Sequence, residues 1–197
     1  MKKFFAVLVL FALSACVPSS PPSRTVTTTV AWRDFSLVLH ADNHFNELGR
    51  RIIVEAAENI RRLTHGRARL DVVFDLDFDS IENLKAHMAA NHSMVFGVLS
   101  DYDVVKTLDE GLRGPGTILA ATVETKSRSQ FVFLILDRIA EDKFSNVVTH
   151  EFGHVIGFPD LDAMGAIMSG RSASNEPAIL DWAEADLKLC REFHYCD

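Results

Sequence analysis

The sequence predicts a single α/β or α+β domain built around a mixed five-stranded sheet. The chain has 197 residues, of which 48% are hydrophobic and 24% are charged, as in an ordinary globular domain with a substantial core. Segments with the period of strands alternate along the chain with segments that have the period of helices. Residues 94–99 and 131–136 are continuous apolar runs, which is typical of strands buried on both faces.

The first half of the chain supplies two strands and two helices. Residues 26–39 are rich in threonine, valine and aromatic residues and predict the first strand. Residues 46–63 place their apolar side chains on one stripe and predict an amphipathic helix. Residues 70–79 alternate apolar residues with aspartates, which predicts a strand with one solvated, acidic face. Residues 80–91 predict a short helix capped by Ser80.

The second half supplies three strands and two helices. Between the two continuous apolar runs lies a further strand at residues 116–124, which the breaker Gly114-Pro115-Gly116 introduces. Residues 142–156 predict a helix, because apolar positions recur there and a glycine and a proline follow. Residues 177–193 predict the last helix, which begins with a proline, a residue that suits a first helical turn.

The N-terminus carries the features of an export signal. Two lysines precede an apolar run too short to span a bilayer, so residues 1–15 predict a signal peptide. The segment Leu13-Ser14-Ala15-Cys16 resembles a bacterial lipobox, in which Cys16 becomes the lipid-modified N-terminus. The alternative is an ordinary secretory signal with a chance cysteine. Residues 16–24 are rich in proline and serine and predict a tether, which leaves residues 25–197 as the folded domain.

Anchoring and charge narrow the range of partners. A lipid on Cys16 would anchor the chain to a membrane of the bacterial cell envelope, and Val17 after it favours the outer membrane. The formal net charge is −7 and the basic residues do not cluster, which argues against nucleic acid as a partner. We expect a monomer. Cys190 and Cys196 remain, and an exported location permits a disulfide between them; the alternative is two free thiols.

The chemistry is concentrated in His150-Glu151-Phe152-Gly153-His154, inside a predicted helix. Residues four apart lie on one side of a helix, so the two imidazoles converge on one point, and neutral imidazoles suit zinc. Glu151 lies too far around the helix for a good third ligand but can take a proton from metal-activated water. Gly157 lets the backbone turn out of the helix, which brings Asp160 within reach of the metal.

This pattern, followed by Met168 in Ile167-Met168-Ser169-Gly170, resembles the metzincin clan of zinc peptidases, and most closely its snapalysin-like and matrixin-like members. The motif-level resemblance covers residues 114–193. It implies a mixed five-stranded sheet, an active-site helix, a methionine turn beneath the metal, and a C-terminal helix. It further implies that a polypeptide substrate lies extended along an edge strand, here residues 116–124. The implied roles are zinc ligand for His150, His154 and Asp160, general base for Glu151, and methionine-turn residue for Met168.

The expected function is therefore that of a zinc-dependent endopeptidase. An aspartate ligand is the minority choice in the clan, and Asp162 is close enough in sequence to compete with Asp160. One alternative function is a non-catalytic, zinc-containing envelope module that captures peptides, against which the retained Glu151 argues. Another is an amide hydrolase acting on cell-wall peptides or a small molecule.

The remaining polar residues are interpreted as solvated surface. The acidic face could bind a hard cation such as Ca²⁺, but its alternation favours an ordinary solvated strand face. That face consists of Asp71, Asp75, Asp77 and Asp79. The histidines outside the motif are also interpreted as surface residues, namely His40, His44, His65, His87, His92 and His194.

Overall fold

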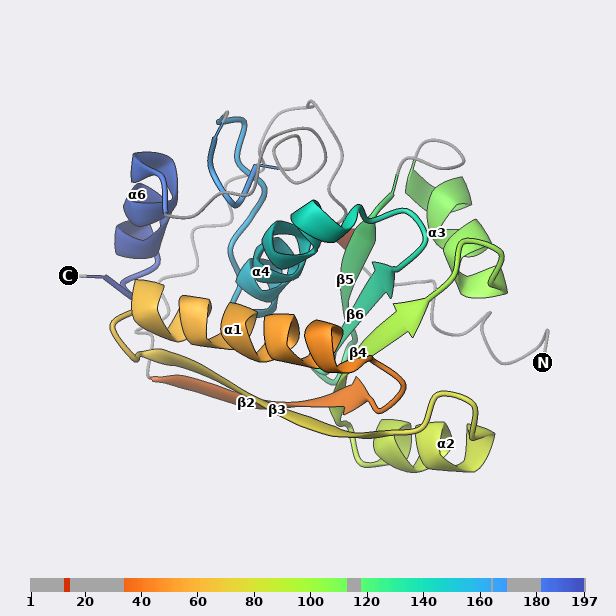
Figure 1. Cartoon of the computed structure of the whole chain (residues 1–197). Helices are drawn as coiled ribbons and strands as arrows, with labels where there is room; N and C mark the ends of the chain where they lie inside the picture. The colour runs from red at the N-terminus through yellow and green to blue at the C-terminus, as the bar shows by residue number, and fades with distance from the viewer. Residues whose placement is uncertain (1–12, 15–33, 113–117, 164, 170–181, 197) are drawn as a thin grey trace.

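The structure, a computed structural model, describes residues 13–14, 34–112, 118–163, 165–169 and 182–196. The expected lipidation site Cys16 and the tether lie outside these ranges, and so do residues 170–181. Within the described ranges, no helix combines the length and the apolar character needed to cross a membrane. Figure 1 shows a twisted sheet with helices on both of its faces.

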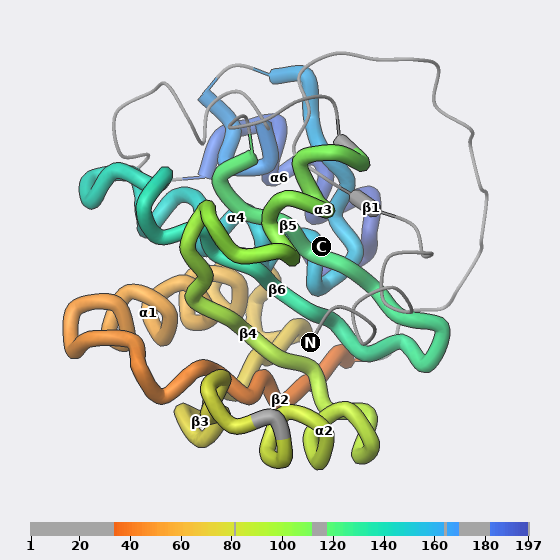
Figure 2. The backbone as a smooth tube through the Cα atoms, turned by 90° about the vertical axis from the view of Figure 1, so that its right-hand side faces the viewer, coloured from red at the N-terminus to blue at the C-terminus, as the bar shows by residue number. Residues whose placement is uncertain are grey.

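The sheet is mixed, as the sequence predicted, and most of its strand pairs are parallel. Its strand order is β1-β5-β6-β4-β2-β3, and Figure 2 lets the reader follow the order from β3 to β5. β2 runs parallel to β3 and β4, β4 runs parallel to β6, and β5 runs antiparallel to β6. Five of the strands form the domain's sheet, and β1 adds two residues antiparallel to β5. The strands are β1 (Leu13–Ser14), β2 (Phe35–Asp42), β3 (Ala68–Leu76), β4 (Ser93–Val98), β5 (Ala120–Glu124) and β6 (Gln130–Ile135).

Two hydrophobic clusters hold the helices to the sheet. The larger lies between the sheet and the helices α1 and α4, where Ile60 and Val148 are fully buried. The smaller lies on the opposite face and includes Val105 of α3. β4 sends Val95 into the larger cluster and Met94 into the smaller one, so its continuous apolar run is buried on both faces. The helices are α1 (Glu47–Leu63), α2 (Ile81–Ala89), α3 (Asp103–Leu112), α4 (Phe144–Val155) and α6 (Glu184–Glu192), with a 3₁₀ turn η2 (Glu141–Lys143) before α4.

The helix α3 was missed at the sequence level. It is short, and it lies where the prediction passed directly from one buried strand to the next. Its signal was nevertheless present, because Val104, Val105 and Leu108 share one side of a helix and are all buried against the sheet.

Several element boundaries differ from those predicted. Of the predicted strand 116–124, only Ala120–Glu124 is a described strand. Two further differences have a clear physical reason. The first strand was expected at residues 26–39, but the described strand β2 continues to Asp42, because Leu39 and Ala41 both face the larger core. The last helix was expected from Pro177, which lies outside the described residues. Ala183 still has an extended backbone, and its N–H donates to the Asp186 carboxylate at 3.1 Å. The described helix α6 therefore begins only at Glu184.

Candidate metal centre

The helix α4 carries the predicted metal motif in the middle of the molecule. Residues 146–155 are all buried, because α4 packs against both α1 and the strands β5 and β6 (Figure 1). Gly157 ends the helix with a backbone φ of +96°, a conformation that favours glycine. The N–H of Phe158 donates to the carbonyl of Gly153 at 2.9 Å and closes this turn. The turn sends the chain back toward the motif, as the sequence predicted.

Three side chains converge at the end of this helix. The Nε2 atoms of His150 and His154 lie 3.0 Å apart. One carboxylate oxygen of Asp160 lies 3.3 Å from Nε2 of His150 and 3.5 Å from Nε2 of His154. Ligands at the usual zinc distance of about 2.0–2.1 Å in a tetrahedron are separated by about 3.3 Å, so this triangle fits one tetrahedral face. Among the described residues, Asp160 and not Asp162 belongs to this potential metal-binding group.

Backbone carbonyls fix the orientation of both imidazoles. Nδ1 of His150 donates to the carbonyl of Ile167, and Nδ1 of His154 donates to the carbonyl of Phe158, each at 2.7 Å. A carbonyl only accepts, so in the neutral ring the proton lies on Nδ1 and the Nε2 atom carries the lone pair that can bind a metal. Both rings are buried, which holds them in this orientation.

The charges around the site favour an ion pair in the metal-free chain. Burial alone would raise the pKa of Asp160, but hydrogen bonds from His150 and His154 outweigh it and hold that pKa well below its usual range. Burial would lower the pKa of His154, but its hydrogen bond to Asp160 and the charge of Glu151 raise it above the ordinary value. Metal binding therefore has to displace a proton from this histidine.

Glu151 is held by a residue that sequence reasoning missed. Its side chain is buried, with the residue 1% exposed, and the Thr122 hydroxyl donates to its Oε2 atom at 2.6 Å. The same hydroxyl lies 3.2 Å from the Glu151 carbonyl oxygen. Thr122 belongs to β5, so the sheet edge and the helix of the metal motif are tied together at the carboxylate. Nothing local in the sequence marks Thr122 for this role.

The predicted methionine turn lies directly against the motif. Met168 is fully buried, and a Cβ added to Gly153 would lie 2.2 Å from its sulfur. The N–H groups of Ile167 and Met168 donate to the two carboxylate oxygens of Asp186, at 2.9 and 3.0 Å. Asp186 is fully buried in the first turn of α6. It holds the turn in place, and the sequence analysis did not identify it.

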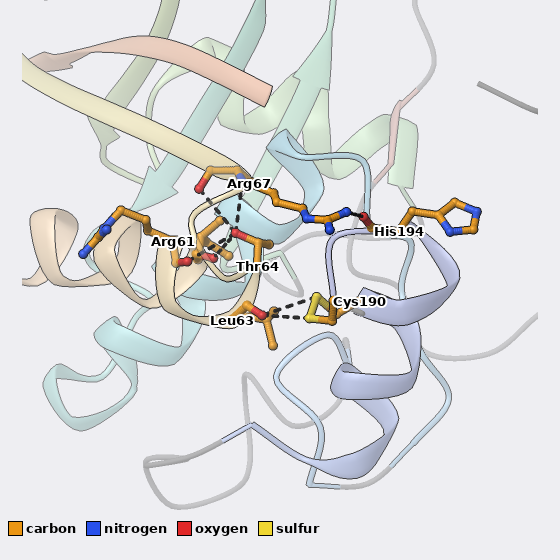
Figure 3. Close-up of a disulfide and its surroundings, with 9 residues drawn as sticks. Arg61, Leu63, Thr64, Arg67, Cys190 and His194 are labelled. Atoms are coloured by element: carbon orange, nitrogen blue, oxygen red, sulfur yellow. Dashed lines mark hydrogen bonds between the residues drawn. A yellow bond between two sulfur atoms is a disulfide. The ribbon is translucent and has the colours of Figure 1, made fainter. Parts of the chain in front are cut away.

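The predicted disulfide between Cys190 and Cys196 is present. Figure 3 shows it beside the end of α1, where the two sulfurs lie 3.4 and 2.8 Å from the carbonyl oxygen of Leu63. The Arg67 guanidinium donates to the carbonyl of His194 at 2.9 Å in the same region. The bridge thus fastens the C-terminus to the end of α1, away from the metal-binding group.

A scan against protein-family models finds no match to this chain, and a search of curated proteins finds no matching sequence. Its function is therefore inferred from its residues and from the geometry of this site.

Proposed function

We propose that this chain is a zinc-dependent endopeptidase of the metzincin type. His150, His154 and Asp160 would hold the zinc, and Glu151 would act as general base. The observation that carries the proposal is the triangle of ligand atoms with sides of 3.0, 3.3 and 3.5 Å. Three protein ligands leave a fourth position open, which distinguishes catalytic zinc sites from closed structural ones.

The bound ion and the chain would divide the work of peptide hydrolysis. Zinc would supply Lewis acidity, which acidifies water and polarises the scissile carbonyl. Glu151 would accept the proton of the attacking water and pass it to the leaving amine. Thr122 would keep the Glu151 carboxylate in one orientation through its hydrogen bond of 2.6 Å. The mixed five-stranded sheet, the helices α1 and α4 and the buried Met168 agree with the arrangement that the resemblance implies.

The edge strand β5 supports a polypeptide substrate. The side of β5 that faces away from β6 pairs antiparallel with Leu13–Ser14, with Ser14 opposite Thr122. An extended segment can therefore bind beside the residue that contacts Glu151. Cleavage before Cys16 would remove Leu13–Ser14 and leave this edge to the substrate. In the same proposal, a lipid on Cys16 anchors the enzyme in the bacterial envelope, at the outer membrane.

The test compares the zinc-loaded mature chain with its Glu151→Gln variant on a broad peptide mixture that includes cell-wall peptides. The wild type should cleave polypeptides, and the variant should lose about a hundredfold or more of the rate while retaining zinc. Glu55→Gln makes the same chemical change at an exposed position of α1 and should cleave like the wild type.

Three results would redirect the proposal. Full activity in Glu151→Gln would remove Glu151 as general base. Zinc binding without cleavage by the wild type would favour the non-catalytic peptide-binding module. Cleavage confined to cell-wall peptides would favour the amide hydrolase.

A further inference from the structure

A second group of histidines lies on the face of the sheet opposite α4. His40 is in β2 and stands in register with Met94, which belongs to the smaller core, whereas its neighbours Leu39 and Ala41 face the larger one. Its side chain is only 15% exposed, so its interpretation as a surface residue was wrong. The other two members come from different elements: His87 from the last turn of α2, and His92 from the turn before β4.

The three rings pack directly on one another. The rings of His40 and His92 are stacked with centroids 4.2 Å apart, and the His87 ring lies 4.7 Å from His40 and 5.1 Å from His92. The Nδ1 atoms of His87 and His92 are 2.9 Å apart. At that distance the two atoms can share one proton, so at least one of them directs a lone pair into the cluster. Each residue offers a ligand atom within 4.8 Å of the others.

Asp75 provides the partner that metal-binding histidines usually have. Both of its carboxylate oxygens lie near Nδ1 of His40, at 2.9 and 3.1 Å. Ionised carboxylates only accept, so Nδ1 of His40 carries the proton and Nε2 is the nitrogen left for a metal. A carboxylate that orients a ligating imidazole is a recurrent feature of metal sites. The sequence predicted Asp75 only as part of a solvated acidic face. In the structure Asp75 instead makes a specific contact with His40.

We infer that His40, His87 and His92 form a second metal site, which binds a divalent transition-metal ion of the zinc or copper kind. Three imidazoles without a coordinating carboxylate suit such ions rather than Mg²⁺ or Ca²⁺. A bound ion would bring the three ligand nitrogens, which lie within 4.8 Å of one another, to separations of about 3.3 Å. The site is separate from the proposed catalytic centre, because it uses the other face of the sheet.

The site would have a structural consequence. It joins one strand to the end of a nine-residue helix and to the turn that leads into the next strand. A helix of that length has little stability of its own in water and depends on its packing. A metal at its last turn would fasten α2 to the sheet.

The test counts bound metal in the mature chain after removal of all metal by chelator and reloading with Zn²⁺. The wild type should bind about two zinc ions, and His87→Gln and His154→Gln about one each. The control is His194→Asn, because asparagine tolerates the positive φ of 58° at this position. This variant should bind as many zinc ions as the wild type.

The outcomes separate the two sites. One zinc in both the wild type and His87→Gln, with none in His154→Gln, would overturn this second site and leave the proposed catalytic centre intact. Loss of zinc in His87→Gln with none lost in His154→Gln would overturn the catalytic centre instead.

A second measurement guards against misfolding. His40→Gln and His87→Gln should keep the wild-type thermal midpoint in the presence of chelator. Zn²⁺ should then raise that midpoint less in these variants than in the wild type, because they bind one ion fewer. An equal rise in the wild type and in both variants would contradict the inference.

Discussion

The hydroxyl of Thr122 links strand β5 to the Glu151 carboxylate. Thr122→Val keeps the shape of the side chain but removes this donor. We expect kcat to fall about ten- to hundredfold, the equivalent of one hydrogen bond to a charged group, with a smaller change in KM. Steady-state kinetics on a cleaved peptide measures both. Thr122→Ser keeps the hydroxyl and should recover most of the rate, and an unimpaired kcat in Thr122→Val would contradict the positioning role.

Gly153 is required by its neighbour Met168 rather than by its own backbone. A methyl group at Gly153 would lie 2.2 Å from the methionine sulfur, so the fully buried Met168 side chain would have to shift. We expect Gly153→Ala to lower the free energy of unfolding by about 1–3 kcal/mol through overpacking. Denaturant unfolding measures this change.

The double variant tests the same contact. In Gly153→Ala/Met168→Ala the shortened side chain leaves room for the new methyl group, so the two effects should not add. A strictly additive pair would mean that the methionine turn does not press on the helix as described.

At the level of elements, Asp186 joins the helix α6 to the methionine turn. Its carboxylate accepts N–H groups from Ile167, Met168 and Ala183, and the residue is fully buried. Asp186→Asn replaces one acceptor oxygen by a donor that faces these N–H groups. We expect a loss of about 1.5–3 kcal/mol in the free energy of unfolding and faster loss of zinc to a chelator.

The control for this prediction lies on the same helix. Glu184→Gln changes an exposed carboxylate of the first turn and should alter stability by only about 0.5 kcal/mol or less. If the two variants behaved alike, Asp186 would not be the residue that holds the turn.

Most elements were predictable because their patterns are local. The stripe of α1 and the alternation of β3 can be seen within single segments. The structure contains the stripe, and it keeps the alternation from Leu70 to Phe74. Beyond a register shift, Leu76 joins the smaller core instead. The start of α6 could not be predicted in this way. It is set by the contact between Asp186 and Ala183 beside the methionine turn, and not by a proline further upstream. An element boundary fixed by tertiary hydrogen bonds leaves little trace in the periodicity of the sequence.

For the molecule as a whole, pH should act in opposite directions with and without metal. The lowered pKa of Asp160 stabilises the fold above the ordinary value of 3.8, and this contribution is lost as the pH falls. The raised pKa of His154 stabilises the fold below the ordinary value of 6.5, and this contribution is lost as the pH rises. The metal-free protein should therefore lose stability as the pH rises above the ordinary histidine pKa of 6.5. The zinc-loaded protein should gain stability there, because its ligands must be deprotonated.

Thermal unfolding across this pH range, with chelator or with Zn²⁺, checks the reversal. His154→Gln removes the group to which the effect is attributed. In chelator this variant should therefore lack the loss of stability with rising pH that His154 causes. The same slope with and without metal in the wild type would contradict the assignment of the ion pair to the metal-binding group.

The sequence by itself determined the features that depend on short spacing. Two histidines one helical turn apart must share a side of the helix, and a glycine that follows can turn the chain back, which brought Asp160 to both imidazoles. Only the tertiary structure decided which distant segments meet there. Thr122 and Asp186 reach their partners because β5 lies beside α4 and α6 lies beside the methionine turn. The same holds for the cluster of three histidines, which come together from three elements on the other face of the sheet. The helical period fixes neighbours within a turn, whereas neighbours between elements follow from strand order and from the faces that the two cores bury.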